Sequence, residues 1–257
     1  MRLFSAFERP QPASVAADDT RISSAWLLFA TLGNMLAALV VAGILAGHAG
    51  LPLDGWLLGV ALVAALPSLA PLLRGQVASR WPELAAALLA VLAIGGAGLY
   101  AAWPSLLPMG ISVDAAHHMQ LIDWLVTHRA LPPITNATRG LLGEMSAYPA
   151  GFALLVLAAA RATGRPALET MYPCAVIVGG LVAGVVVVLA AGPAAATQSR
   201  WWRALLLLTG PLFLLSHATF FMDAYLDQSY YTMLFGVLLT LLAFGHALAL
   251  PRWPLAA

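Results

Sequence analysis

Long runs of apolar residues dominate the chain, and short polar segments separate them. An α-helix rises about 1.5 Å per residue, so roughly 20 apolar residues are needed to cross the hydrocarbon core of a bilayer, which is about 30 Å thick. The pattern predicts six transmembrane helices, at residues 25–47, 56–73, 83–103, 169–192, 204–221 and 229–250. The predicted fold class is therefore an all-α integral membrane protein with about six transmembrane helices. Its long external first loop is expected to carry juxtamembrane helices.

A seventh apolar run, at residues 149–160, is too short for a full crossing. Pro149 bounds it on one side, and Arg161 to Pro166 bound it on the other. Two interpretations stay open, a short span or a helix that lies at the membrane interface.

Composition agrees with a membrane protein. Of the 257 residues, 61% are hydrophobic and 9% are charged, and the mean hydropathy is +0.88. A soluble domain carries roughly 25% charged residues. The net charge of +1 gives no reason to expect nucleic acid binding. The one cysteine, Cys174, lies inside an apolar run, so we expect a buried packing residue.

The arginines set the predicted orientation. With the N-terminus in the cytoplasm and residues 149–160 not crossing the membrane, eight of the 12 basic residues, all arginines, fall on the cytoplasmic side, as the positive-inside rule favours. The chain then divides into a cytoplasmic tail (1–24), three transmembrane helices (25–103), an external loop (104–168), and three transmembrane helices with a short cytoplasmic tail (169–257). The composition is typical of a GC-rich bacterial genome. We expect the inner (plasma) membrane, with the active face external, or periplasmic.

The first polar segment of interest follows the third predicted span. Residues 113–129 read as a helix with Ser112 as its N-cap. Asp114, His117 and His118 stand at i, i+3 and i+4, so they are expected to share one helix face. A carboxylate and two imidazoles can bind a divalent metal, hold a phosphate, or transfer protons. The alternative is an amphipathic interfacial helix whose polar residues simply face water.

Residues 134–147 have the composition of a loop. Arg139 in this segment contacts either a phosphate group or water. Tyr148, Pro149, Ala150 and Gly151 then begin the short apolar helix, because proline is well placed in the first turn of a helix.

A second acidic segment follows the predicted span 204–221. Asp223 and Asp227 lie there beside aromatic residues, at the membrane edge. They either belong to a plain hydrated loop or approach Asp114 across the external surface. Two carboxylates so paired could hold a metal ion or shift each other's pKa.

This order of elements resembles the GT-C superfamily of polytopic membrane glycosyltransferases. The superfamily includes protein O-mannosyltransferases, aminoarabinose transferases and the catalytic subunit of oligosaccharyltransferase. The features that carry the resemblance are the acid after a span, the helix with histidines, the Tyr-Pro start of a short helix, and a second acid after a later span. The resemblance covers residues 104–250. It implies transfer of a sugar from a polyprenyl-phosphate-linked donor to an acceptor on the external face of the bilayer.

The resemblance also implies roles for individual residues. Asp114 corresponds to the first-loop acid, which orients the acceptor, acts as base, or helps to hold a metal. Asp227 corresponds to the second-loop acid, with Asp223 as its alternate, and would assist with the acceptor or metal. Tyr148 opens the second juxtamembrane helix. The residues with looser parallels would contact the donor phosphate or a divalent metal ion; these are His117, His118 and Arg139.

Two departures from the family keep other interpretations open. Two additional spans precede the first acid. The family's later spans, and the later loops that contribute to donor binding, have no counterpart within these 257 residues. The chain is then expected to be the N-terminal module of such an enzyme, one half of a split enzyme, or a degenerate relative. A non-catalytic membrane subunit that packs with a partner chain is the main alternative, because Gly179-Gly180 and Ala183-Gly184 permit close helix approach. A transporter fragment fits less well, because the spans contain few charges and no inverted repeat.

Overall fold

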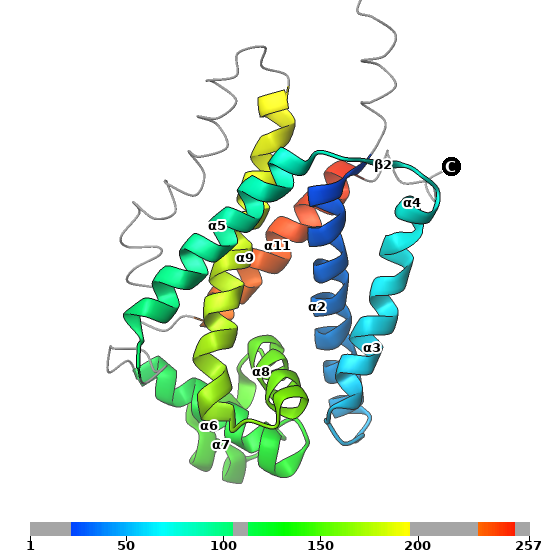
Figure 1. Ribbon diagram of the computed structural model, residues 1–257. Coiled ribbons are helices and arrows are strands. Elements are labelled where there is room, and N and C mark those ends of the chain that lie inside the picture. Colours follow the sequence, from blue (N-terminus) through cyan, green and yellow to red (C-terminus); the bar gives the residue numbers. More distant parts are fainter. Residues whose placement is uncertain (1–21, 105–112, 196–230, 250–257) are drawn as a thin grey trace, which may run out of the picture.

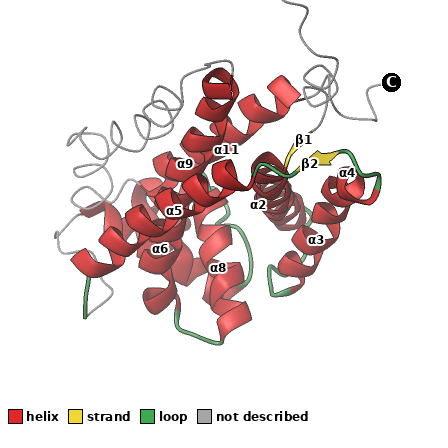
Figure 2. Ribbon diagram, turned by 45° about the horizontal axis from the view of Figure 1, so that its top comes forward, coloured by secondary structure: helices red, strands yellow, loops and turns green. Residues whose placement is uncertain are grey.

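The computed structural model describes residues 22–104, 113–195 and 231–249 (Figure 1). This part of the chain is mostly helical, with short loops and a two-residue parallel pairing of β1 (Ile22–Ser23) with β2 (Val77–Ala78) (Figure 2). The α-helices are α2 (Ser24–His48), α3 (Trp56–Ala65), α4 (Ala70–Leu73), α5 (Trp81–Ala101), α6 (Val113–His128), α7 (Asn136–Leu142), α8 (Gly151–Thr163), α9 (Ala167–Ala195) and α11 (Tyr231–Ala249). Two 3-10 helices, η1 (Leu66–Leu69) and η2 (Gly143–Ala147), complete the described elements.

Five of the predicted spans are present as helices long and apolar enough to cross a membrane. They are Ser24–His48, Trp56–Leu73, Trp81–Ala101, Ala167–Ala191 and Tyr231–Leu248, each within a few residues of its predicted bounds. The sixth prediction, 204–221, lies outside the described residues. The protein is an all-α, multi-pass membrane protein, as its sequence predicts.

The short apolar run forms α8, which has 13 residues. A helix of that length rises about 20 Å, less than the hydrocarbon thickness, so α8 alone cannot cross. It meets the preceding segment, Asn136–Ala147, at a bend of 99°. Together with α6, these elements gather at one end of the bundle, and we call Val113–Thr163 the juxtamembrane layer (Figure 1).

Ring contacts at both ends of α11 fix its direction. Tyr231 at its start stacks on His118 of the juxtamembrane layer, with ring centroids 5.6 Å apart. His246 near its end meets Trp26 at the start of α2, at 5.4 Å. Like α9, α11 therefore runs away from the layer (Figure 1), whereas α2 runs toward it.

Glycines let α9 lie close to its neighbours. A Cβ atom added at Gly180 would lie 2.8 Å from the Val91 carbonyl oxygen of α5. One added at Gly184 would lie 2.5 Å from Cζ of Phe29 on α2 and 2.7 Å from Cγ2 of Val91. The small-residue stripe that suggested a partner chain is thus used for packing within this chain.

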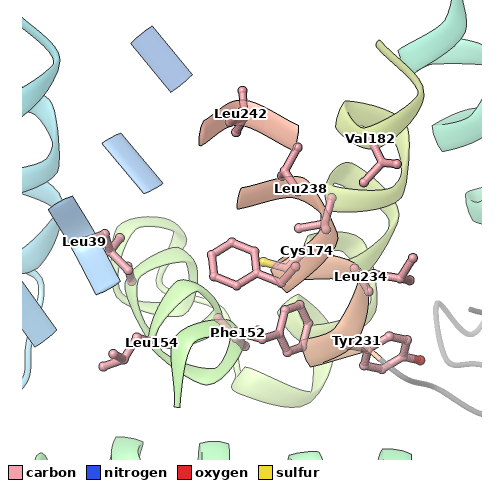
Figure 3. Close-up of a cluster of buried hydrophobic side chains, with 14 of the residues drawn as sticks. Leu39, Phe152, Leu154, Cys174, Val182, Tyr231, Leu234, Leu238 and Leu242 are labelled. Atoms are coloured by element: carbon pink, nitrogen blue, oxygen red, sulfur yellow. The ribbon is translucent and has the colours of Figure 1, made fainter. Parts of the chain in front are cut away.

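The core of the bundle forms where α2, α8, α9 and α11 meet (Figure 3). Cys174 is buried there, as its apolar surroundings predicted. Leu39, Leu154, Val182, Leu234, Leu238 and Leu242 surround the same region. Phe152 and Tyr231 close this core on the side of the juxtamembrane layer.

The tryptophans near the ends of the long helices occupy two different environments. Trp56, Trp81 and Trp103 are exposed at helix ends, as interface anchors would be. Trp26 is 7% exposed and packs into α11, where its ring occupies the space beside Gly245. Trp26 is therefore a packing residue, because a glycine on a neighbouring helix gives it a buried position.

Candidate functional site

Helix α6 forms over the predicted residues, with Asp114 in its first turn, where the helix dipole favours a carboxylate. Its buried face consists of His118, Leu121, Ile122 and Leu125, which have the i, i+3, i+4, i+7 spacing of a core-facing stripe. Asp114 and His117 lie at the edge of this face, with side chains 39% and 45% exposed. The three polar residues therefore do not share one environment, because His118 is only 3% exposed.

Three aromatic rings surround the imidazole of His118. Phe152 belongs to α8, Tyr148 precedes α8, and Tyr231 is the first residue of α11. The ring centroid of His118 lies 5.6 Å from that of Tyr148 and 6.0 Å from that of Phe152, both in edge-on geometry. On the other side Tyr231 stacks at 5.6 Å with an interplanar angle of 28°. His118 thus joins α6, α8 and α11 at a single point.

A small cavity opens beside this aromatic cluster. It has a volume of about 60 Å³ and is lined by Asp114, His117, His118, Glu144, Met145 and Tyr148. A water molecule occupies about 30 Å³, so the cavity has room for one or two waters or a small substrate group. Four of the predicted site residues, Asp114, His117, His118 and Tyr148, are therefore brought together. We call this space the Asp114 cavity.

Glu144 enters the cavity wall from η2 although the sequence did not single it out. It stands thirty residues after Asp114, in a segment interpreted as a loop. That interpretation was wrong, because residues 136–147 are helical. Thr135 caps α7 by accepting a hydrogen bond from the Thr138 amide at 3.1 Å. Thr135 itself was the available signal, because threonine is among the residues preferred at helix N-caps.

Arg139 lies on α7 and is exposed. It does not belong to the wall of the Asp114 cavity. Asp223 lies outside the described residues. Of the other residues assigned to substrate binding, Arg139 is therefore the one that does not line the Asp114 cavity.

The interaction between the two exposed groups of the cavity is loose. His117 Nδ1 lies 4.0 Å from Asp114 Oδ1, beyond hydrogen-bond distance. Within residues 22–104, 113–195 and 231–249, no group of three or more His, Cys, Asp or Glu side chains could hold a metal ion. Asp223 and Asp227 lie outside these residues, so the metal site stays a prediction.

Comparison of the chain with protein-family models, curated proteins and solved structures found no match.

Proposed function

We propose that this protein is a GT-C-type glycosyltransferase module. It transfers a sugar from a polyprenyl-phosphate-linked donor to an acceptor at the end of the bundle that carries the juxtamembrane layer. The observation that carries the proposal is the Asp114 cavity, which gathers a carboxylate, two imidazoles, a second carboxylate and a phenol at the end of the bundle where the candidate spans meet the juxtamembrane layer. A site at this level suits a donor whose lipid part stays in the membrane while its sugar reaches water.

In the proposed reaction, the Asp114 carboxylate accepts the proton of an acceptor hydroxyl. The acceptor oxygen attacks the anomeric carbon of the sugar, and the bond from that carbon to the donor phosphate breaks. The polyprenyl phosphate leaves with the bonding electron pair. His117, half-exposed beside Asp114, is placed to stabilise the phosphate by hydrogen bonding.

The position of Tyr231 supports a role for the second acidic segment. Tyr231 contacts His118 of the cavity wall, and Asp227 stands four residues earlier in the sequence. Four residues reach at most about 14 Å and eight residues at most about 29 Å, so chain connectivity allows Asp227, or Asp223 as its alternate, to complete the site. With Asp114, one of them would orient the acceptor or bind a divalent metal ion.

The test is sugar transfer by the full chain reconstituted in liposomes with polyprenyl-phosphate sugars labelled in the sugar. Asp114→Asn keeps the size of the side chain but removes the base, so the rate is expected to fall about 10²- to 10⁴-fold. Asp123→Asn is the matched control, because Asp123 is exposed on the same helix and lies outside the cavity. Turnover by Asp114→Asn equal to that of Asp123→Asn would refute the proposed role.

A further inference from the structure

A second cavity, of about 350 Å³, lies at the junction of α8 and α9. Small-molecule sites occupy roughly 300–1,000 Å³, so this volume is sufficient for a ligand. Arg161, Arg165, Gly164 and Ala167 form much of its wall, and Val126 of α6 closes one side. Val126 stands eight residues after His118, about 12 Å along the helix, so this space is separate from the Asp114 cavity. We call it the arginine cavity.

Arg161 is held in place at the wall of this cavity. Its Nη2 donates a hydrogen bond to the Val126 carbonyl oxygen at 3.1 Å, and its Nε lies 3.3 Å from Oδ1 of Asp54. Asp54 also pairs with Arg129 at the end of α6. These contacts fix the guanidinium before any ligand arrives, which reduces the entropy lost on binding.

Arg165 is held much less firmly. Its Nη1 lies 3.4 Å from Oε2 of Glu169, and the two side chains are 70% and 53% exposed. Exposed ion pairs of this kind are weak, so an incoming anion can replace the carboxylate. The ion pairs at this cavity involve three arginines, Arg129, Arg161 and Arg165. Two carboxylates, those of Asp54 and Glu169, oppose them, so the group has an excess positive charge.

The cavity lies at the start of a candidate membrane span, where lipid headgroups are expected. Ala167 in its wall is the first residue of the candidate span Ala167–Ala191. Leu168, the next residue, is 47% exposed and offers an apolar surface beside the arginines. A guanidinium recognises phosphate by charge-assisted hydrogen bonds, and an apolar surface suits a hydrocarbon chain.

We propose that the arginine cavity binds the phosphate group of an anionic membrane lipid, with Arg161 and Arg165 as its ligands. The site is independent of sugar transfer at the Asp114 cavity and does not rest on the proposed function. Free inorganic phosphate offers the same oxygen atoms to the arginines, and the experiment below distinguishes it from the lipid.

The test is native mass spectrometry of the full chain in a neutral detergent, titrated with phosphatidylglycerol and, separately, with phosphatidylcholine. The first phosphatidylglycerol is expected to bind at least about tenfold more tightly than phosphatidylcholine. Arg165→Gln is expected to remove this preference, and Arg165→Lys to reduce it less, because lysine keeps the charge but not the planar fork. Arg74→Gln is the matched control, since Arg74 is an exposed arginine at the opposite end of the bundle.

Arg161→Gln also breaks the contacts to Asp54 and Val126, so Arg165→Gln is the decisive variant, with thermal unfolding as the check of its fold. Equal binding of the two lipids by the unaltered chain would overturn the proposal. So would equal phosphatidylglycerol binding by Arg165→Gln and Arg74→Gln. Inorganic phosphate is also titrated as a competitor. If it displaces phosphatidylglycerol completely, with a Kd equal to that of the lipid, the ligand is soluble phosphate and the lipid proposal fails.

Discussion

At the scale of single residues, His118 combines packing with a place in the candidate site. Its ring is buried among Tyr148, Phe152 and Tyr231, and it also contributes to the wall of the Asp114 cavity. Its neighbour His117 differs in that its side chain is 45% exposed. The two histidines are adjacent in the sequence, but substitution of His118 is expected to affect packing, whereas substitution of His117 is not.

Substitution of His118 separates these two roles. His118→Ala is expected to lower the free energy of unfolding by about 2–4 kcal/mol, because it leaves a cavity among three rings. His118→Phe restores an aromatic ring and is expected to recover most of this loss, but not sugar transfer. Unfolding in mixed detergent measures the first effect. His117→Ala, as the control, should change stability by less than about 0.5 kcal/mol. Equal stability of His118→Ala and His117→Ala would contradict the packing assigned to His118.

The helical spacing of Asp114, His117 and His118 could be recognised in the sequence, but their separate environments could not. Consecutive helical residues are about 100° apart around the axis, so the adjacent His117 and His118 can lie on different sides of the border between a buried and an exposed face. Which side of the border faces inward depends on α8 and α11, and these helices are distant in sequence. Glu144 escaped the sequence-based prediction for the same reason.

At the scale of helices, the close approach of α9 to α5 and α2 depends on positions without side chains. Gly184 is surrounded by Phe29 and Val91 of those helices. Gly96, on the exposed side of α5, has nothing within 4 Å of the place where a Cβ would stand. The two glycines thus provide a direct comparison between a packed and an unpacked position in spanning helices.

Gly184→Ala is expected to destabilise the protein by about 1–3 kcal/mol, because the added methyl group would force Phe29 or Val91 to move. Gly96→Ala should alter stability by less than about 1 kcal/mol, since no neighbour has to shift. Unfolding of the two variants in mixed detergent, side by side, measures the difference. A Gly184→Ala variant as stable as Gly96→Ala would show that the helices are not packed as described.

The spanning helices were predictable because hydropathy over about 20 residues is a local signal. The bounds of α2, α5, α9 and α11 follow it within a few residues. The short elements were less predictable, because α7 depends on a single cap, and its composition is that of a loop. The buried position of Trp26 depends on a glycine more than two hundred residues away, which no local pattern can indicate.

At the scale of the whole molecule, the direction of the helices relates the two acidic segments. Because α9 and α11 both run away from the juxtamembrane layer, the end of α9 and the start of α11 lie at opposite ends of the bundle. The predicted span 204–221 lies between them in the sequence, outside the described residues. Tyr231 then begins α11 beside His118, and Asp227 precedes it by four residues. The assignment of the layer to the external face stays a prediction from the arginines.

The claim that one site contains both acidic segments is tested most directly by cross-linking. Asp114→Cys and Asp227→Cys are combined in a Cys174→Ala background, and a short bis-maleimide is applied to the protein in membranes. The account predicts efficient intramolecular cross-linking of this pair. It predicts little cross-linking when Asp123→Cys replaces Asp114→Cys, because Asp123 lies on the same helix but outside the cavity. Failure of the first pair, while each single thiol reacts with a simple maleimide, would contradict a shared site.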